Sequence, residues 1–309
     1  RFAATARPDR LVRAVAASDV VHLHDLRFMA GTVCAAAAAT HRPLVFHTHG
    51  LLYHTPFATR LKHFLMRRYY GPWLRAARAW TVASSEPDRD LLLADVPELR
   101  GRTATFENAL DLAPLSNIVR APEPGLIVAT GRVAHHKGID DLLAALALID
   151  DQPWRLEIAG TEDRAERHRL DGIVDRLGLG GRVTFGGEYT DAEHLDRLSR
   201  AAAAAFPSRA EGFGLALLEG LAAGVPVVAR DQPAHRDVLG HDLEDRLVDF
   251  NDHEASAAAL RNTLAMTASE TGLLGDRERD RAQVFDLPRL VGEIYGLYEE
   301  ILGAAEPVG

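Results

Sequence analysis

The chain has 309 residues, of which 47% are hydrophobic and 26% are charged, and its formal net charge is -9 at pH 7. This length is enough for two hydrophobic cores, and the acidic balance argues against general nucleic-acid binding, which usually requires clustered Lys and Arg. A single cysteine, Cys34, excludes an internal disulfide framework, and no apolar run is long enough to span a bilayer. We therefore expect a cytoplasmic protein.

The first half alternates strand-like and helix-like stretches after an opening loop and amphipathic helix. Strands are predicted at DVVHLHD, PLVFHTHG, AWTVASS and RTATFENALD, with helices at AGTVCAAAAAT, from about 56 to 78, and at PDRDLLLA. Such alternation predicts a parallel sheet with both faces covered. Because a doubly wound domain normally opens on a strand, we expect at least one strand and its phosphate-facing loop to precede Arg1, so that the N-terminal domain is incomplete.

The second half restarts after RAPEPG, residues 120–125, where two prolines and a glycine indicate a hinge. Strands are predicted at GLIVATGR, WRLEIAG, RVTFGG and VPVVA. Helices are predicted between these strands, and two more follow the last strand, one from about 253 to 268 and one at LPRLVGEIYGLYEEILG. The alanine run at 201–205 favours helix by propensity, but it falls where a central strand is due, so we predict a strand there.

These patterns predict an α/β protein with two Rossmann-like domains that face each other across a cleft. The expected bounds are 1–119 for the first domain and 120–285 for the second. The remaining residues, 286–309, are expected to form a helix that packs back on the first domain.

Two cations follow the first strand of the second half. In ATGRVAHHKGIDDLL, the strand ends near Gly131, and Arg132 and Lys137 flank a short loop before a helix. Cations beside a helix N-terminus form an anion site, because backbone N–H groups and the helix dipole add to the side-chain charge. This arrangement predicts a phosphate site.

Two carboxylates flank a second helix start in SRAEGFGLALLEGLAAGVPVVA. Glu211 and Glu219 would lie about 12 Å apart along a continuous helix, too far for a glycosidase pair. Each carboxylate can accept hydrogen bonds from a pair of hydroxyl groups. With a diphosphate held between the two helix starts, the pattern of diol, diphosphate and diol indicates a nucleotide sugar.

The sequence resembles the retaining glycosyltransferases of the GT-B fold, family 4. The resemblance rests on GRVAHHKG, on WRLEIAG, on RVTFGGEYTDAEHLDRL and above all on FPSRAEGFGLALLEGLAAGVPVVA, which matches the Glu-x7-Glu motif of that family. It implies transfer of a sugar from a nucleoside-diphosphate sugar to an acceptor hydroxyl. The acceptor is left open as a saccharide, a lipid-linked molecule or another small molecule.

The resemblance also implies a role for each motif residue. Arg132 and Lys137 would bind the donor diphosphate and stabilise its departing charge, and no metal or other cofactor would be needed. His49 would face the donor sugar from the first domain. The implied donor-binding residues, besides these two cations, are Gly186, Gly187 and Glu188 beside the base, Glu211, Gly212, Phe213 and Gly214 at the sugar, and Glu219 at the ribose.

Two other functions stay open at this point. One is a non-catalytic protein that binds nucleotide sugars. The other is a metal-dependent hydrolase, because side chains two apart on a strand share a face, which pairs His22 with His24 and His47 with His49. A core or cleft-lining role for His22, His24 and His47 is the alternative to a metal.

The segment from 60 to 78 is basic in an otherwise acidic chain. It holds six Lys or Arg residues and no acid, interleaved with apolar and aromatic residues. Such asymmetry indicates either attachment to anionic lipid or a charged acceptor, or else a solvated helix that packs its apolar face inward.

Overall fold

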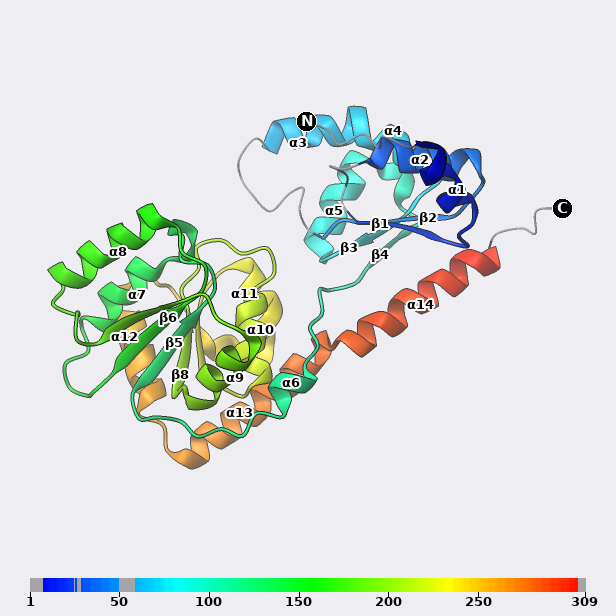
Figure 1. The fold of residues 1–309 in the computed structure, drawn as a ribbon. Coiled ribbons are helices and arrows are strands. Elements are labelled where there is room, and N and C mark those ends of the chain that lie inside the picture. Colours follow the sequence, from blue (N-terminus) through cyan, green and yellow to red (C-terminus); the bar gives the residue numbers. More distant parts are fainter. Residues whose placement is uncertain (1–7, 25, 27–28, 50–58, 305–309) are drawn as a thin grey trace. The chain divides into compact units, whose positions relative to one another are not determined.

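The computed structural model describes residues 8–24, 26, 29–49 and 59–304. The chain divides into two compact units, the first formed by Arg1–Ala109 with Leu287–Gly309 and the second by Leu110–Asp286. Each unit contains one parallel sheet with helices against it (Figure 1). Both are Rossmann-like, as the alternation of strands and helices predicted.

The sheet of the first unit has four parallel strands in the order β1-β2-β3-β4. These are β1 (Val21–His24), β2 (Leu44–His47), β3 (Trp80–Ala83) and β4 (Thr103–Thr105). All four lie in the predicted stretches. Strand β1 pairs with β2 in a register that places His24 opposite His47.

Helices cover both faces of this sheet. Leu44 and Phe46 of β2 pack in one core cluster with residues of α2 (Ala30–Ala39) and α4 (Gly71–Ala76). Val45, which points to the opposite face, packs with Leu297 and Ile301 of α14 (Leu287–Ala304). Figure 1 shows α14 on the side of the sheet away from α2 and α4. This unit also contains α1 (Pro8–Ala16), α5 (Glu86–Asp95) and a 3-10 turn at Pro97–Leu99.

The predicted helix from 56 to 78 is interrupted. Its described part runs through α3 (Thr59–Leu65), a π-helical turn at Met66–Tyr70 and α4, whereas 56–58 lie outside the described residues. Met66, Tyr70 and Leu74 are buried, so one face packs inward. Periodicity alone could not distinguish a π turn from continuous α-helix, since both keep residues four to five apart on one side.

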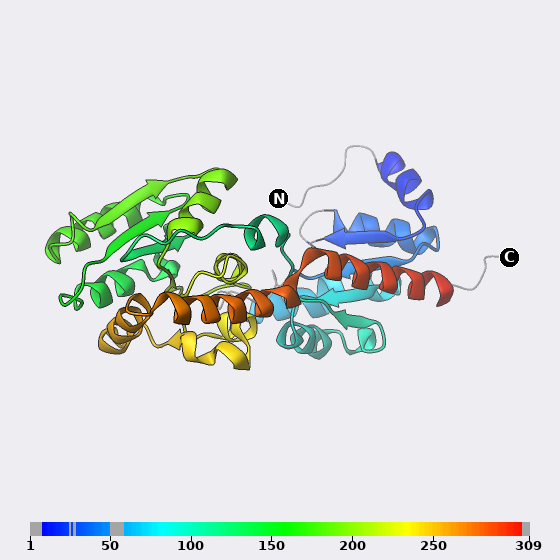
Figure 2. The ribbon, with the colours of Figure 1, turned by 90° about the horizontal axis from the view of Figure 1, so that it is seen from below.

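The sheet of the second unit has six parallel strands in the order β10-β9-β8-β5-β6-β7. Figure 2 shows this unit from below, with helices on both sides of its sheet. The strands are β5 (Leu126–Thr130), β6 (Arg155–Ala159), β7 (Val183–Gly187), β8 (Ala203–Phe206), β9 (Val227–Arg230) and β10 (Leu247–Val248). The strand predicted within the alanine run is confirmed as β8. Alanine suits this strand because helices cover both faces of the sheet and all four residues of β8 are buried.

Helices pack on both faces of this sheet too. The helices are α6 (Ala113–Ser116), α7 (Ile139–Leu146), α8 (Arg164–Arg176), α9 (Asp191–Arg200), α10 (Leu215–Ala222), α11 (Pro233–Leu239), α12 (His253–Leu264) and α13 (Ala268–Ala282). Three of them, α6, α11 and α13, were not predicted. The helix predicted to continue to 268 ends at Leu264, because Thr267 starts α13 with a capping box that uses Glu270.

The units divide after Ala109, earlier than the predicted hinge at 120–125. The physical reason is that the intervening segment belongs to the second core. Leu112 and Leu115 are buried there, and the Leu110 N–H donates to the Phe285 carbonyl at 3.0 Å. Among the described residues, no helix is both long and apolar enough to cross a membrane.

Candidate functional site

The candidate site of the second unit lies where its strand order reverses. Strand β5 is flanked by β6 on one side and β8 on the other, and the connections leave in opposite directions. Ligands of open α/β sheets bind at the carboxyl ends of strands at such a point. A pocket opens there, lined among others by Thr130, Gly131, Arg132, Lys137, Pro207, Ser208, Glu211, Gly214 and His235.

Lys137 and Glu211 form an ion pair in this pocket. The Lys137 ammonium lies 2.5 Å from Glu211 Oε1, and both side chains are largely buried, with 19% and 18% of their surface exposed. Burial works to raise the pKa of Glu211, but the Lys137 charge and hydrogen bonds from Lys137 and Ser208 outweigh it, so the pKa lies below its usual value. Glu211 is therefore ionised at neutral pH, and the pair is lost only as the pH falls through that lowered pKa.

Two glycines allow backbone to approach closely around the pair. Gly138, at the start of α7, has φ +64°, and a Cβ there would come within 2.3 Å of the Pro207 carbonyl oxygen. Gly214 precedes α10 with φ +100° and lies against His235. Two helix N-termini thus begin at this pocket, each at a residue whose conformation favours glycine.

Arg132 completes the positive side of the pocket. Arg132 is exposed, lies two residues after the end of β5, and lines the same pocket as Lys137. No ion pair involving Arg132 is found within the described part of the chain. An exposed guanidinium next to a buried ammonium is suited to bind an anionic group.

A charged network that sequence analysis missed holds the loop after β8. Arg209 contacts Asp140 at 2.9 Å and Asp141 at 2.8 Å, both in the first turn of α7. Arg230 also contacts Asp141, and its Nε donates to the Pro207 carbonyl at 2.7 Å. These contacts fix the turn that carries Glu211. The sequence did show an acidic pair at the start of α7. Acidic residues are common at helix N-termini because they interact favourably with the helix dipole, so the pair did not reveal its arginine partners.

Glu219 lies on α10 and has a different partner. Its Oε2 accepts from His194 Nε2 of α9 at 3.1 Å, and the His194 ring stacks on Tyr189 with centroids 4.9 Å apart. The pKa of Tyr189 is raised, first by burial and then by the Glu219 charge. His194 and Tyr189 were not predicted as site residues. The two motif carboxylates therefore belong to separate neighbourhoods of one loop and helix.

The remaining predicted donor residues fall into two groups, one beside Tyr189 and one beside Glu211. Gly186 and Gly187 end β7, directly before the exposed Glu188 and the stacked Tyr189. Gly212 is exposed, and Phe213 packs its ring edge-on against Phe285 at 5.4 Å. The pocket therefore brings together Arg132, Lys137, Glu211 and Gly214, whereas Gly186–Glu188 lie near Tyr189, towards α9.

The first unit gathers His22, His24, His47 and His49, the histidine cluster, at the carboxyl ends of β1 and β2. Ring centroids of neighbours are 4.1 Å apart for His22 and His24 and 3.9 Å for His47 and His49. Burial, and then the neighbouring imidazoles, lower the pKa of His22 to about 4 and that of His47 to about 3. Both rings are neutral at pH 7.

His49 stands in a left-handed conformation with φ 47°. The residue before it is anchored, because the Thr48 hydroxyl donates to the buried carboxylate of Asp88 in the first turn of α5. Strain of this kind in a non-glycine residue is maintained by its surroundings and often marks a functional position. His49 belongs to the first unit, so its approach to the donor pocket stays a prediction.

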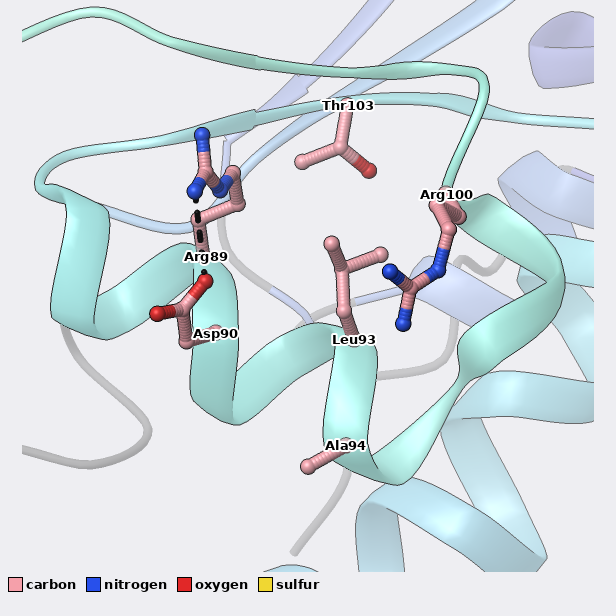
Figure 3. Close-up of a pocket in the computed structure, with 6 residues that line it drawn as sticks. All are labelled: Arg89, Asp90, Leu93, Ala94, Arg100 and Thr103. Atoms are coloured by element: carbon pink, nitrogen blue, oxygen red, sulfur yellow. Dashed lines mark hydrogen bonds and ion pairs between the residues drawn. The ribbon is translucent and has the colours of Figure 1, made fainter.

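The first unit also contains a pocket, which has less functional character than the pocket of the second unit (Figure 3). It is lined by Arg89, Asp90, Leu93, Ala94, Arg100 and Thr103. Arg89 is already paired with Glu86 at 2.5 Å and with Asp90 at 3.3 Å. Its charge is thus neutralised locally, and we assign this pocket no role.

Comparison with known families agrees with the fold. A family model described as Glycosyl transferases group 1 matches residues 116–273, and one described as Glycosyltransferase Family 4 matches residues 1–113. The two matches meet close to the boundary between the units.

Relatives with similar sequences are transferases by name. A GDP-mannose:cellobiosyl-diphosphopolyprenol alpha-mannosyltransferase of Xanthomonas oryzae pv. oryzae is 29% identical over 295 residues, covering 94% of this chain and 76% of the relative. A protein of the same name from Komagataeibacter xylinus is 27% identical over 307 residues, covering 96% of this chain and 75% of the relative.

Solved structures share the fold at low sequence identity. A glycosyltransferase from Rickettsia africae matches with a TM-score of 0.82 and 16% identity, covering 99% of this chain and 85% of that one. Anabaena HepE, in complex with UDP and glucose, matches with a TM-score of 0.73 and 18% identity, covering 95% and 81%. His-x-His pairs at strand ends also occur in metal-dependent hydrolases with (β/α)8 barrels, and two open parallel sheets exclude that fold for the described residues.

Proposed function

The chain belongs to the family of glycosyl transferases group 1 and is an enzyme with the GT-B fold, and we propose that it transfers a sugar from a nucleoside-diphosphate sugar with retention of configuration. The observation that carries the proposal is the Lys137–Glu211 ion pair at the reversal of strand order, beside two helix N-termini and Arg132. A diphosphate suits the cations, and a sugar hydroxyl pair suits the carboxylate.

In the proposed reaction, an acceptor hydroxyl attacks the anomeric carbon of the donor from the face that the diphosphate leaves. The bond from that carbon to the phosphate oxygen breaks, the new glycosidic bond forms, and the hydroxyl proton passes to the departing phosphate. Arg132 and Lys137 stabilise the charge that develops on this phosphate, which is often the largest catalytic contribution. No carboxylate acts as a nucleophile, and no cofactor takes part.

The donor-binding roles follow the two neighbourhoods of the site. Glu211, fixed by Lys137, binds hydroxyls of the transferred sugar, with the backbone of Gly212–Gly214 beside it. Glu219, held by His194, binds the ribose, and the loop of Gly186, Gly187 and Glu188 lies beside the base. Support for this order comes from the separate partners of Glu211 and Glu219. His49 is proposed to face the transferred sugar.

We propose GDP-mannose as the donor and a diphosphopolyprenol-linked saccharide as the acceptor. The relatives from Xanthomonas and Komagataeibacter carry both in their names, and they match nearly the whole chain. Calorimetry with GDP and UDP tests the base, because only one should bind tightly. Transfer of radiolabelled mannose to a lipid-linked acceptor extract tests the reaction, and tight UDP binding without GDP binding would contradict this donor.

Turnover is expected to survive EDTA. The two side-chain cations take the place that a divalent ion fills at other donor phosphates, so removal of free metal should leave the initial rate unchanged. The measurement is the rate of sugar transfer after dialysis against EDTA, compared with the rate after Mg²⁺ is restored. A rate that disappears with EDTA and returns with Mg²⁺ would place a metal at the diphosphate.

We also propose that α3 and the turn after it contact an anionic membrane surface. Leu61 and Phe64 are 54% and 58% exposed beside the basic residues of 60–78. Two of those cations are already paired, Arg67 with Asp95 at 2.7 Å and Arg75 with Glu98 at 2.6 Å. The exposed apolar side chains therefore support the proposal more than the number of charges does.

Replacing Leu61 and Phe64 together by Ser should weaken membrane binding by roughly tenfold or more, because each buried apolar side chain is worth about 1.5 to 3 kcal/mol. The measurement is co-sedimentation with vesicles that contain phosphatidylglycerol, against vesicles of phosphatidylcholine alone. Leu273→Ser is the matched control, since Leu273 is 66% exposed in the other unit. Equal sedimentation of all three proteins would contradict the contact.

A further inference from the structure

Three members of the histidine cluster meet the geometry of a metal site. The ligand nitrogens of His22, His24 and His47 all lie within 4.8 Å of one another. The arrangement follows from the fold, because His22 and His24 share one face of β1 and the strand register places His24 opposite His47 of β2. The site lies within the first unit and does not involve the donor pocket.

Three ring nitrogens of this group lack hydrogen-bond partners within the described chain. His47 is only 4% exposed, and neither of its ring nitrogens has a hydrogen-bond partner within the described chain. Nε2 of His22 is also buried without one. A buried histidine that serves only the core is normally hydrogen-bonded, so three unpartnered nitrogens in one cluster need an explanation.

In His22 and His24, the second ring nitrogen has a hydrogen-bond partner, as metal ligands usually do. His22 Nδ1 lies 2.5 Å from the Tyr298 hydroxyl of α14, and His24 Nδ1 lies 2.6 Å from His49 Nε2. Metal-bound histidines almost always hydrogen-bond through the nitrogen that does not coordinate, which fixes the tautomer and the ring orientation. In His22 and His24 this leaves Nε2 as the ligand atom.

We propose that His22, His24 and His47 bind a zinc ion, with a fourth coordination position open. Neutral imidazole is a preferred zinc ligand, and three histidines with one open position form a known class of zinc site. Nitrogens bound at about 2.0 to 2.1 Å in a tetrahedron lie roughly 3.4 Å apart, so the rings must move by about 1 Å to bind the ion. Rotation of exposed His24 and half-buried His22 about their side-chain bonds supplies this movement.

Zinc binding to the untagged protein tests the proposal. After dialysis against EDTA, titration with ZnCl2 in a calorimeter should show one ion per chain, and Co²⁺ in its place should give the visible absorption of a tetrahedral site. His47→Gln should weaken binding by tenfold or more because it removes a ligand. Tyr298→Phe should weaken it by roughly 10 to 100-fold, because the hydrogen bond that orients His22 is lost.

Matched controls separate this site from other effects. His168→Gln, an exposed histidine of the second unit, should bind zinc as the wild type does. GDP titration should give the same affinity in all variants, so the outcome does not depend on the proposed donor site. Circular dichroism reports folding of His47→Gln, and Tyr298→Phe tests the site without loss of a ligand. Absence of saturable zinc binding, or equal affinity in the wild type, His47→Gln and Tyr298→Phe, would overturn the proposal.

Discussion

Glu211→Gln is expected to lower turnover by roughly tenfold or more while leaving the Kd of the free nucleoside diphosphate nearly unchanged. The substitution keeps the size of the side chain and an oxygen that accepts from Lys137, which lies 2.5 Å away. It removes the negative charge that we propose to lie near an anomeric carbon that becomes cationic in the transition state. An interaction present only in the transition state affects turnover, and a charge-assisted contact is worth about 1.5 to 3 kcal/mol.

Glu219→Gln is expected to weaken nucleotide binding while leaving turnover nearly unchanged. Its carboxylate accepts from His194 Nε2 at 3.1 Å and is proposed to bind the ribose, whose contacts do not change during the reaction. Loss of such a contact raises the Michaelis constant and weakens free nucleotide by similar factors, with turnover little changed. The expected loss is roughly tenfold or more.

Steady-state rates and a GDP titration on both variants distinguish these effects. Glu299→Gln, an exposed acid on α14 of the other unit, serves as the control for loss of one charge. If Glu211→Gln lost nucleotide binding while Glu219→Gln lost only turnover, the donor would lie in the reverse direction. The proposed order of sugar and ribose along this loop and helix would then be wrong.

Alternating apolar strands and helices predicted most of the fold, and position along the chain predicted β8 against its alanine propensity. Helices α11 and α13 were missed because their sequences carry weak apolar stripes between charged residues, as in ASETGLLGDRERDRA. The predicted boundary between the two units lies too late in the chain. Proline and glycine indicate a turn, but whether a segment belongs to a core depends on contacts such as that of Leu110 with Phe285.

Sequence analysis predicted several residues that line the candidate pocket, but not which residues they contact. Sequence analysis assigned Lys137 and Glu211 to the donor, and the structure adds that they pair with each other. It placed His22 with His24 and His47 with His49, but only the register of β1 and β2 brings the pairs together. The partners of Arg67 and Glu219 come from α5 and α9, and no local pattern reveals contacts between separate elements.

Lys137→Ala is expected to weaken binding of the nucleoside diphosphate by roughly tenfold to a hundredfold and binding of the nucleoside hardly at all. The lost ammonium contributed a charge-assisted contact of about 1.5 to 3 kcal/mol to the phosphates. Its loss also leaves the largely buried Glu211 carboxylate without its partner, and that charge repels the anionic ligand. Arg176→Ala, which removes an exposed cation from the far end of α8, should leave both affinities unchanged.

The double variant Lys137→Ala/Glu211→Gln separates the two causes of that loss. If the unpaired Glu211 charge contributes, its removal should restore part of the nucleoside-diphosphate affinity lost in Lys137→Ala, because no carboxylate then opposes the phosphates. Calorimetry of GDP and guanosine with the wild type, both single variants and the double variant completes the cycle. Equal losses for GDP and guanosine in Lys137→Ala would contradict the assignment, since a contact to phosphate cannot weaken a ligand that has none.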